Sequence, residues 1–313
     1  MVLGSGNKRP LMRYMQMIKQ FLVRCGPDFP AVRAALWIHA RRAGFKIRFA
    51  EECIVLSKEG RRLVLSKKQY VQVPWMLRWF NSYFESFDSV QDGIHKVLDF
   101  SKPALHRYRA SQASFYFPSI PEDDVMTMYV KHYAPKPGDI VWDVGAHAGA
   151  STYFFAQMVG QDGKVFAFEP DEENFGYLVK NIELHGLRNI VPVRKALADH
   201  TGTAIFNMDG SMAAGLSEFV EYRDKQSSRL VATSTLQDAC AEIGSVPNYV
   251  KMDIEGAEVA VIRGSLDFLK DHRIHFAIES NHKVEESYTW KPLEVLFSRV
   301  GYQAMSSDEW ASS

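Results

Sequence analysis

The segment at residues 249–258 constrains the fold of this chain more than any other feature. Val250, Met252 and Ile254 alternate with polar residues, which is the period-two pattern of a strand. Gly256 then allows a sharp turn. Packing alone does not require the three acidic residues that lie within residues 253–258. The pattern therefore predicts a strand whose carboxyl end carries function, because open α/β sheets bind ligands at that end.

A second segment, residues 139–152, reads as a strand, a glycine turn and the start of a helix. Gly145 allows a tight turn, and Gly149 allows the backbone to approach a ligand closely. The next predicted strand ends in Glu169, 26 positions after Asp143. This spacing is near the one at which an acidic residue reaches the ribose hydroxyls in nucleotide-binding βαβ units.

At these residues the chain resembles the FkbM family of S-adenosylmethionine (SAM) dependent methyltransferases. The resemblance runs from about residue 121 to 302, and its motifs are residues 143–149, 168–170 and 251–258 with Gly264. It implies a class I methyltransferase fold, a Rossmann-like α/β fold with a mostly parallel sheet flanked by helices. It also implies SAM as the methyl donor, and an acceptor hydroxyl on a sugar, a polysaccharide unit or a secondary metabolite.

Several residues are expected to bind the donor. Glu169 would hold the ribose diol, Asp143 would accept from the ammonium group of SAM, directly or through water, and Asp199 lies where class I methyltransferases often bind adenine. The remaining candidates form the turn and the helix start around the amino-acid end of SAM: Gly145, Ala146, Gly149 and Ser151. For Asp143 and Asp199 a purely structural role in a turn stays open.

The acceptor hydroxyl needs a general base, and the candidates lie at two strand ends: Asp253, Glu255, Glu279 and His282. His282 is the candidate whose ordinary pKa suits base work near neutrality. Asp253, Glu279 and Asn281 also offer an oxygen-ligand set that suits Mg²⁺, although the resemblance does not require a metal. Lys251 is expected to pair with a surface acid, and Glu258 to pin the turn or the helix cap.

Charge divides the chain into two expected domains. Residues 1–118 carry 20 Lys and Arg against 8 Asp and Glu, whereas residues 119–313 carry 17 against 29. The basic, aromatic-rich first part reads as a small α+β region, and the second as the methyltransferase domain. Either the two parts dock through complementary fields, or the basic part approaches an anionic acceptor, a membrane surface or a nucleic acid.

The first part also contains aromatic residues at helical spacing, from Trp75 to Phe87. This stripe is typical of a core face, and acceptor binding is the alternative. An RNA-binding signature is missing, which argues against a nucleic-acid partner. An apolar run long enough to span a membrane is missing as well. The three widely spaced cysteines favour the cytoplasm, and the oligomeric state is not readable.

Two other functions stay open. An NAD-dependent oxidoreductase would also use Glu169, but residues 145–149 lack the G-x-G-x-x-G pattern. A non-catalytic binding module would carry a degenerate methyltransferase domain, as His147 (usually Asn in the family) and the short carboxyl terminus allow. Helices are further expected at residues 122–133 and 257–269, and an acceptor loop at residues 211–228.

Overall fold

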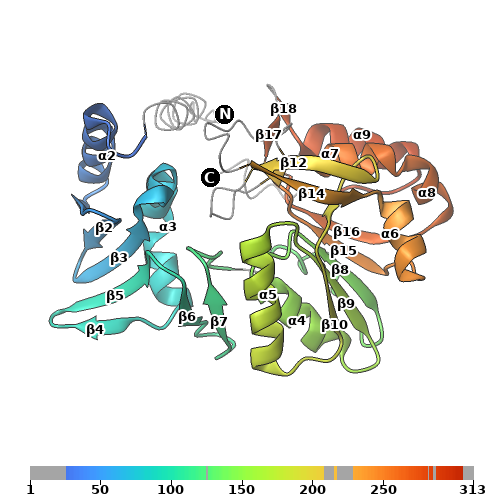
Figure 1. Cartoon of the computed structure of the whole chain (residues 1–313), viewed down its shortest axis with the longest axis horizontal. Coiled ribbons are helices and arrows are strands. Elements are labelled where there is room, and N and C mark those ends of the chain that lie inside the picture. The colour runs from blue at the N-terminus through green and yellow to red at the C-terminus, as the bar shows by residue number, and fades with distance from the viewer. Residues whose placement is uncertain are drawn as a thin grey trace, which may run out of the picture. The chain divides into compact units, whose positions relative to one another are not determined.

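A computed structural model of the chain describes residues 26–124, 126–207, 215–216, 228–280, 282–284 and 287–305. It contains two compact units, Met1–Asp123 and Asp124–Ser313 (Figure 1). The boundary predicted after residue 118 lies close to this division. Among the described residues, no helix has both the length and the apolar character needed to cross a bilayer.

The first unit contains a five-stranded sheet of order β1-β2-β3-β5-β4 and a β6-β7 hairpin. Its elements are α2 (Pro30–Arg42), β1 (Lys46–Phe49), β2 (Cys53–Lys58), β3 (Arg61–Ser66), the 3₁₀ helix η1 (Lys67–Gln72), α3 (Val73–Ser86), β4 (Val90–Asp92), β5 (His95–Phe100), β6 (Ala104–Arg107) and β7 (Ser114–Phe117). Glu59 and Gly60 link β2 to β3, and both have the positive φ that a two-residue hairpin turn requires.

The aromatic stripe lies mainly on α3, and most of it is core. Phe80, Tyr83 and Phe87 are buried and contact neighbouring rings, including Phe100 of β5. Trp75, by contrast, is 45% exposed. The core interpretation therefore holds for the inner residues of the stripe.

The second unit is built on a five-stranded parallel sheet of order β10-β9-β8-β15-β16. The main elements of this unit are β8 (Ile140–Val144), α4 (Ala150–Val159), β9 (Lys164–Phe168), α5 (Glu172–His185), β10 (Ile190–Val193), α6 (Leu236–Ile243), β15 (Tyr249–Met252), α7 (Glu258–Gly264), α8 (Leu266–Asp271), β16 (His275–Ile278) and α9 (Trp290–Arg299). Its order reverses between β8 and β15, which is where a doubly wound sheet opens a ligand crevice. The predicted fold class, with a smaller α+β region that precedes the sheet in the sequence, is confirmed.

Alternate residues of these strands enter two cores, one on each face of the sheet. Val141 and Val165 pack with residues of α4 and α5, whereas Trp142, Phe166 and Val250 pack with residues of α6 to α9. Burial on both faces explains why these strands read as apolar runs. The parallel sheet is therefore anchored from both sides, and the strand ends that form its rim are fixed.

Smaller strands complete the second unit. They are β11 (Ala196–Leu197), β12 (Gly202–Asn207), β13 (Gly215–Leu216), β14 (Ser228–Ser234), β17 (Lys283–Val284) and β18 (Ser287–Tyr288). Among the described residues, β16 is an edge strand of the five-stranded sheet, and β17 and β18 pair with each other in a separate two-stranded sheet. The expected acceptor loop at residues 211–228 lies outside the described residues, except for β13 and Ser228.

Two helix predictions were wrong in detail. The described residues between 122 and 133 form turns and bends: the Asp124 carboxylate accepts hydrogen bonds from the backbone of Met126 and Thr127, and one helical turn, closed by the Val130 N–H and the Met126 carbonyl, is not continued. The helix predicted over residues 257–269 is divided into α7 and α8 at Ser265, whose hydroxyl donates to the carbonyl of Val261.

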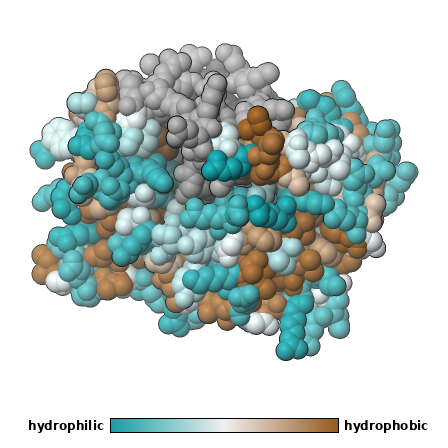
Figure 2. Space-filling view, viewed as in Figure 1, coloured by the Kyte–Doolittle hydropathy of each residue, from teal (hydrophilic) through white to brown (hydrophobic). Residues whose placement is uncertain are grey.

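Polar and apolar residues are interspersed on the described surface in Figure 2. This is the usual condition of a protein surface, and it does not by itself mark a site.

Candidate functional site

The glycine turn, residues 145–149, connects β8 to α4 at the carboxyl edge of the sheet. Gly145 has φ +79°, and a Cβ there would lie 1.9 Å from the backbone oxygen of Asp253. Gly149 has φ +84°, and a Cβ there would lie 2.6 Å from Leu178 Cδ1. The backbone N–H groups of Gly145 and Ala146 both donate to the carbonyl of Phe168 at 3.0 Å. The turn is therefore held between β9 and the end of β15, and it requires glycine at both positions.

Asp143 and Lys251 form a buried ion pair beneath this turn. They face each other in the register of β8 and β15, with Lys251 Nζ 3.2 Å from Asp143 Oδ1. Lys251 also donates to the carbonyl of Gly145 at 2.8 Å, and Ser151 and Thr152 donate their hydroxyls to Asp143 Oδ2. The expectation that Lys251 pairs with a surface acid was wrong, because its β15 position faces the interior of the sheet. The donor-binding roles of Asp143 and Ser151 stay predictions.

Glu169 follows β9 and is 5% exposed. Its carboxylate accepts hydrogen bonds from the backbone N–H of His147 at 2.8 Å and of Asp171 at 2.9 Å. Burial raises the pKa of Glu169 to about 7, although these two hydrogen bonds lower it. Glu169 thus joins the glycine turn to the loop after β9. Its binding of the ribose stays a prediction.

Asp199 lies in the loop between β11 and β12 and is exposed. Its Oδ1 atom lies 2.8 Å from Nδ1 of His200. A Cβ at Gly264 would lie 2.9 Å from Asp199 Cα, so the loop packs closely against the end of α7. The structure gives Asp199 a position at the rim, and its adenine-binding role stays a prediction.

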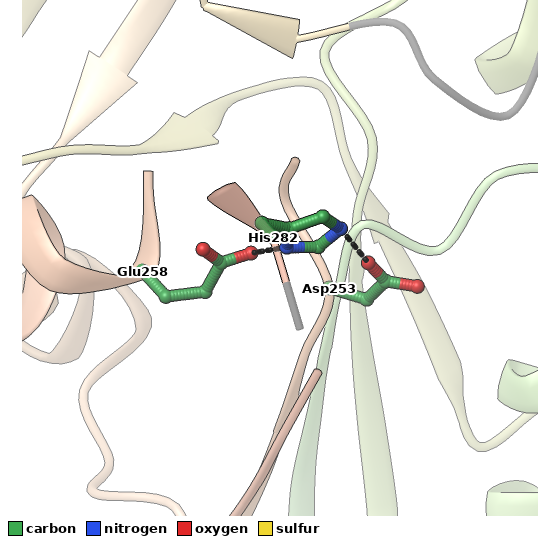
Figure 3. A group of neighbouring side chains, drawn as sticks. All are labelled: Asp253, Glu258 and His282. Atoms are coloured by element: carbon green, nitrogen blue, oxygen red, sulfur yellow. Dashed lines mark ion pairs between the residues drawn. The ribbon is translucent and has the colours of Figure 1, made fainter. Parts of the chain in front are cut away.

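Three side chains converge beyond the ends of β15 and β16, and we call Asp253, Glu258 and His282 the His282 cluster. Figure 3 shows the two carboxylates on opposite sides of the imidazole ring. His282 Nδ1 lies 3.1 Å from Glu258 Oε1, and Nε2 lies 3.8 Å from Asp253 Oδ1. Nε2 also lies 3.6 Å from Glu255 Oε2. The two carboxylates of the cluster and that of Glu255 therefore all lie near one imidazole.

The cluster is tied to the fold by two further contacts. Glu258 is fully buried, and its Oε1 accepts from the backbone N–H groups of Ile254 and Gly256. This confirms that Glu258 pins the turn. Tyr129 donates its hydroxyl to Asp253 Oδ2 at 3.2 Å. Asp253 and His282 keep side-chain exposures of 16% and 17%, so the cluster opens to solvent on their side.

The surroundings of His282 change its chemistry. Burial alone would lower the pKa of His282, but the contact with Glu258 and the charges of Glu255 and Asp253 raise it to about 10. At neutral pH the ring therefore holds a proton and cannot accept a second one. The ordinary pKa that favoured His282 as the base does not apply in this environment.

Of the predicted metal set, Asp253 belongs to the described group of possible ligands and Glu279 does not. Glu279 follows β16, is half-buried, and donates its backbone N–H to the carbonyl of Met252. It is not a member of the described group whose ligand atoms could share one ion, and Asn281 lies outside the described residues. Sequence reasoning missed Tyr129 and the closeness of Glu258 to His282. Both contacts join segments that are far apart in the sequence, so no local pattern indicates them.

Comparison with known protein families gives one match that covers all of these features. The family model described as the methyltransferase FkbM domain matches residues 143–304, which include the glycine turn, Glu169 and the His282 cluster. Hexuronic acid methyltransferase AglP of Haloferax volcanii is 28% identical over 163 residues, or 51% of this chain and 62% of that protein. Protein-L-isoaspartate O-methyltransferase of Aeropyrum pernix is 39% identical over 59 residues, or 19% and 23%. The chain spans less than two thirds of either relative.

The comparison with solved structures also gave matches. Methyltransferase FkbM from Methylobacillus flagellatus KT has a TM-score of 0.38 and 16% identity, covering 80% of this chain and 48% of that chain. TYW2 of M. jannaschii in complex with AdoMet has a TM-score of 0.37 and 18% identity, covering 66% and 76%.

Proposed function

Because the chain belongs to the FkbM methyltransferase family, we propose that it transfers a methyl group from SAM to a hydroxyl oxygen of a sugar, a polysaccharide unit or another metabolite. The observation that carries this proposal is the position of the glycine turn and the His282 cluster on adjoining strand ends, within the matched residues. Gly145 of the turn and Asp253 of the cluster are in backbone contact range, as the Cβ clash at 1.9 Å shows.

On the donor side, SAM would lie over the ends of β8 and β9. Glu169 would accept from the ribose hydroxyls, and the glycine turn would enclose the amino-acid end, with Asp143 and Ser151 beneath it. Asp199 would contact the adenine. Methyl transfer is an in-line displacement, so alignment of donor and acceptor is the main contribution, and it can supply about 7–11 kcal/mol.

On the acceptor side, the hydroxyl would be activated at the His282 cluster. Asp253 and His282 are the members with solvent access. Glu279 would lie at the end of β16, on the same solvent-exposed side of the cluster. A sugar hydroxyl suits this polar site, and the hexuronic acid methyltransferase among the relatives supports a sugar or glycan acceptor. The free thiols Cys53 and Cys240 agree with the cytoplasm as the proposed compartment.

Calorimetric titration of the full chain with SAM, S-adenosylhomocysteine and NAD tests the donor. We expect the two sulfur nucleosides to bind and NAD not to bind. NAD binding without SAM binding would support the oxidoreductase alternative, which family membership does not favour. Transfer of a labelled methyl group to uronic acids and neutral sugars then tests the acceptor. SAM binding without transfer to any acceptor would favour the binding-module alternative.

The Asp253→Asn variant tests the acceptor side. We expect turnover to fall about 10²–10⁴-fold, the range for loss of acid–base assistance, while SAM affinity stays unchanged. Glu242→Gln, a change at an exposed ion pair with Lys195, is the matched control and should keep full turnover. Full turnover in Asp253→Asn would remove this carboxylate from the chemistry.

A further inference from the structure

We propose that Asp253, Glu258 and His282 bind a divalent transition-metal ion. This inference rests on the proposed function, because the ion would lie where the acceptor hydroxyl is activated. It uses Glu258 and His282 in place of Glu279 and Asn281, so it differs from the ligand set expected from sequence.

The geometry of the cluster suits one ion. One ligand atom from each of the three side chains lies within 4.8 Å of the other two. Two ligand atoms of one tetrahedral ion are about 3.4 Å apart when metal–ligand bonds are about 2.1 Å long. The most distant pair therefore needs to close by up to about 1.4 Å, and the partly exposed Asp253 and His282 are the side chains with room to rotate.

The buried carboxylate of Glu258 gives an independent reason for a ligand. Its Oε2 atom is buried and has no hydrogen-bond partner among the described residues, whereas Oε1 is engaged by the turn and by His282. Buried polar atoms are nearly always satisfied, and an ion is one of the ordinary explanations when a protein partner is missing. Oε1 is the oxygen that faces His282 (Figure 3), so the carboxylate would have to turn for Oε2 to reach an ion in the cluster.

Charge leads to the same conclusion. Asp253, Glu255 and Glu258 all lie within 4.0 Å of the His282 ring, so their mutual repulsion must be offset. An ion with two positive charges offsets this repulsion more than a single proton does. Glu255 also lies close enough to ligate or to orient the ion from the solvent side.

The ligand types select the class of metal. An imidazole nitrogen with two carboxylates suits Mn²⁺, Fe²⁺, Co²⁺ or Zn²⁺ better than Mg²⁺, which prefers an all-oxygen shell. When bound, such an ion would polarise the acceptor hydroxyl as a Lewis acid. Glu258 and His282 would bind the ion from the buried side of the cluster, and Asp253 would bind it from the solvent-exposed side.

Titration of the metal-stripped full chain with Mn²⁺, followed by electron paramagnetic resonance, tests the site directly. We expect one bound ion per chain. His282→Ala and Glu258→Gln should each weaken Mn²⁺ binding by at least about tenfold. Glu258→Gln keeps an oxygen that can accept from the Ile254 and Gly256 N–H groups, so we expect this variant to fold. His132→Ala, which removes an exposed imidazole elsewhere in this unit, should bind Mn²⁺ like the unaltered chain.

The outcomes separate this proposal from the proposed function. Absence of Mn²⁺ binding up to about 1 mM, or equal binding in the folded Glu258→Gln variant, would overturn the metal site. SAM binding to the metal-stripped chain, measured by calorimetry, reports on the donor site alone. Mn²⁺ binding without SAM binding would leave the metal site standing and overturn the methyltransferase proposal.

Discussion

The glycine turn and the His282 cluster lie on neighbouring strand ends, but they are held in place by different interactions. The turn is fixed by backbone contacts and by the fully buried pair of Asp143 and Lys251. The cluster is held mainly by side chains contacting one another, and two of its members reach solvent. Substitutions in and beneath the turn should therefore change stability and donor binding together. Substitutions at the solvent-facing members of the cluster should change ion binding or turnover with less effect on folding.

Gly145→Ala should show the largest effect. The added Cβ meets the backbone oxygen of Asp253 at 1.9 Å, and φ at +79° is already unfavourable for alanine. We expect the free energy of unfolding to fall by more than about 4 kcal/mol, which few single substitutions reach. Chemical denaturation measures it. Gly176→Ala, on α5 with open space around its Cβ, is the control and should be neutral or slightly stabilising. Equal stability of both variants would contradict the rigidity assigned to the turn.

Lys251→Met should come next. It leaves the buried carboxylate of Asp143 without its cation and frees the carbonyl of Gly145. Breaking a buried pair in this way costs about 3–5 kcal/mol. The double variant Asp143→Asn with Lys251→Met should recover part of that loss, because it leaves no unpaired charge. Denaturation of the single and double variants completes the comparison, and a double variant as unstable as the single one would argue against the ion pair.

The two regions also differ in how far the sequence predicts them. The glycine turn, Glu169 and the strand-end acids follow from local patterns, since each depends on neighbouring residues. The Asp143–Lys251 pair depends on the register between β8 and β15, which are far apart in the sequence. The contact of His282 with Glu258 likewise joins the loop after β16 to the start of α7. Local patterns do not contain such information, and at residues 122–133 the apolar spacing that predicted a helix is realised as a single turn that is not continued.

The pH dependence of stability should separate Glu169 from other carboxylates. Burial raises its pKa from 4.5 to about 7 in the folded chain, so the folded state binds this proton more tightly than the unfolded state. Its contribution to stability is therefore full below pH 4.5 and is lost as the pH rises through 7. The loss amounts to about 3 kcal/mol. We expect the unfolding free energy of the unaltered chain to fall over this range relative to Glu169→Gln. Parallel pH profiles would contradict the buried position of this carboxyl group.

Glu169→Ala should have the smallest effect, and it sharpens the comparison because it is measured on the donor and not on the fold. Loss of charge-assisted hydrogen bonds to the ribose should weaken SAM binding by about 1.5–3 kcal/mol. Calorimetry measures this change, with the circular dichroism spectrum as the check on folding. Asp253→Asn is the matched carboxylate control at the cluster, and it should leave SAM affinity unaltered. If both variants lost affinity equally, the donor and acceptor sides could not be assigned to separate strand ends, and the division between turn and cluster would fail.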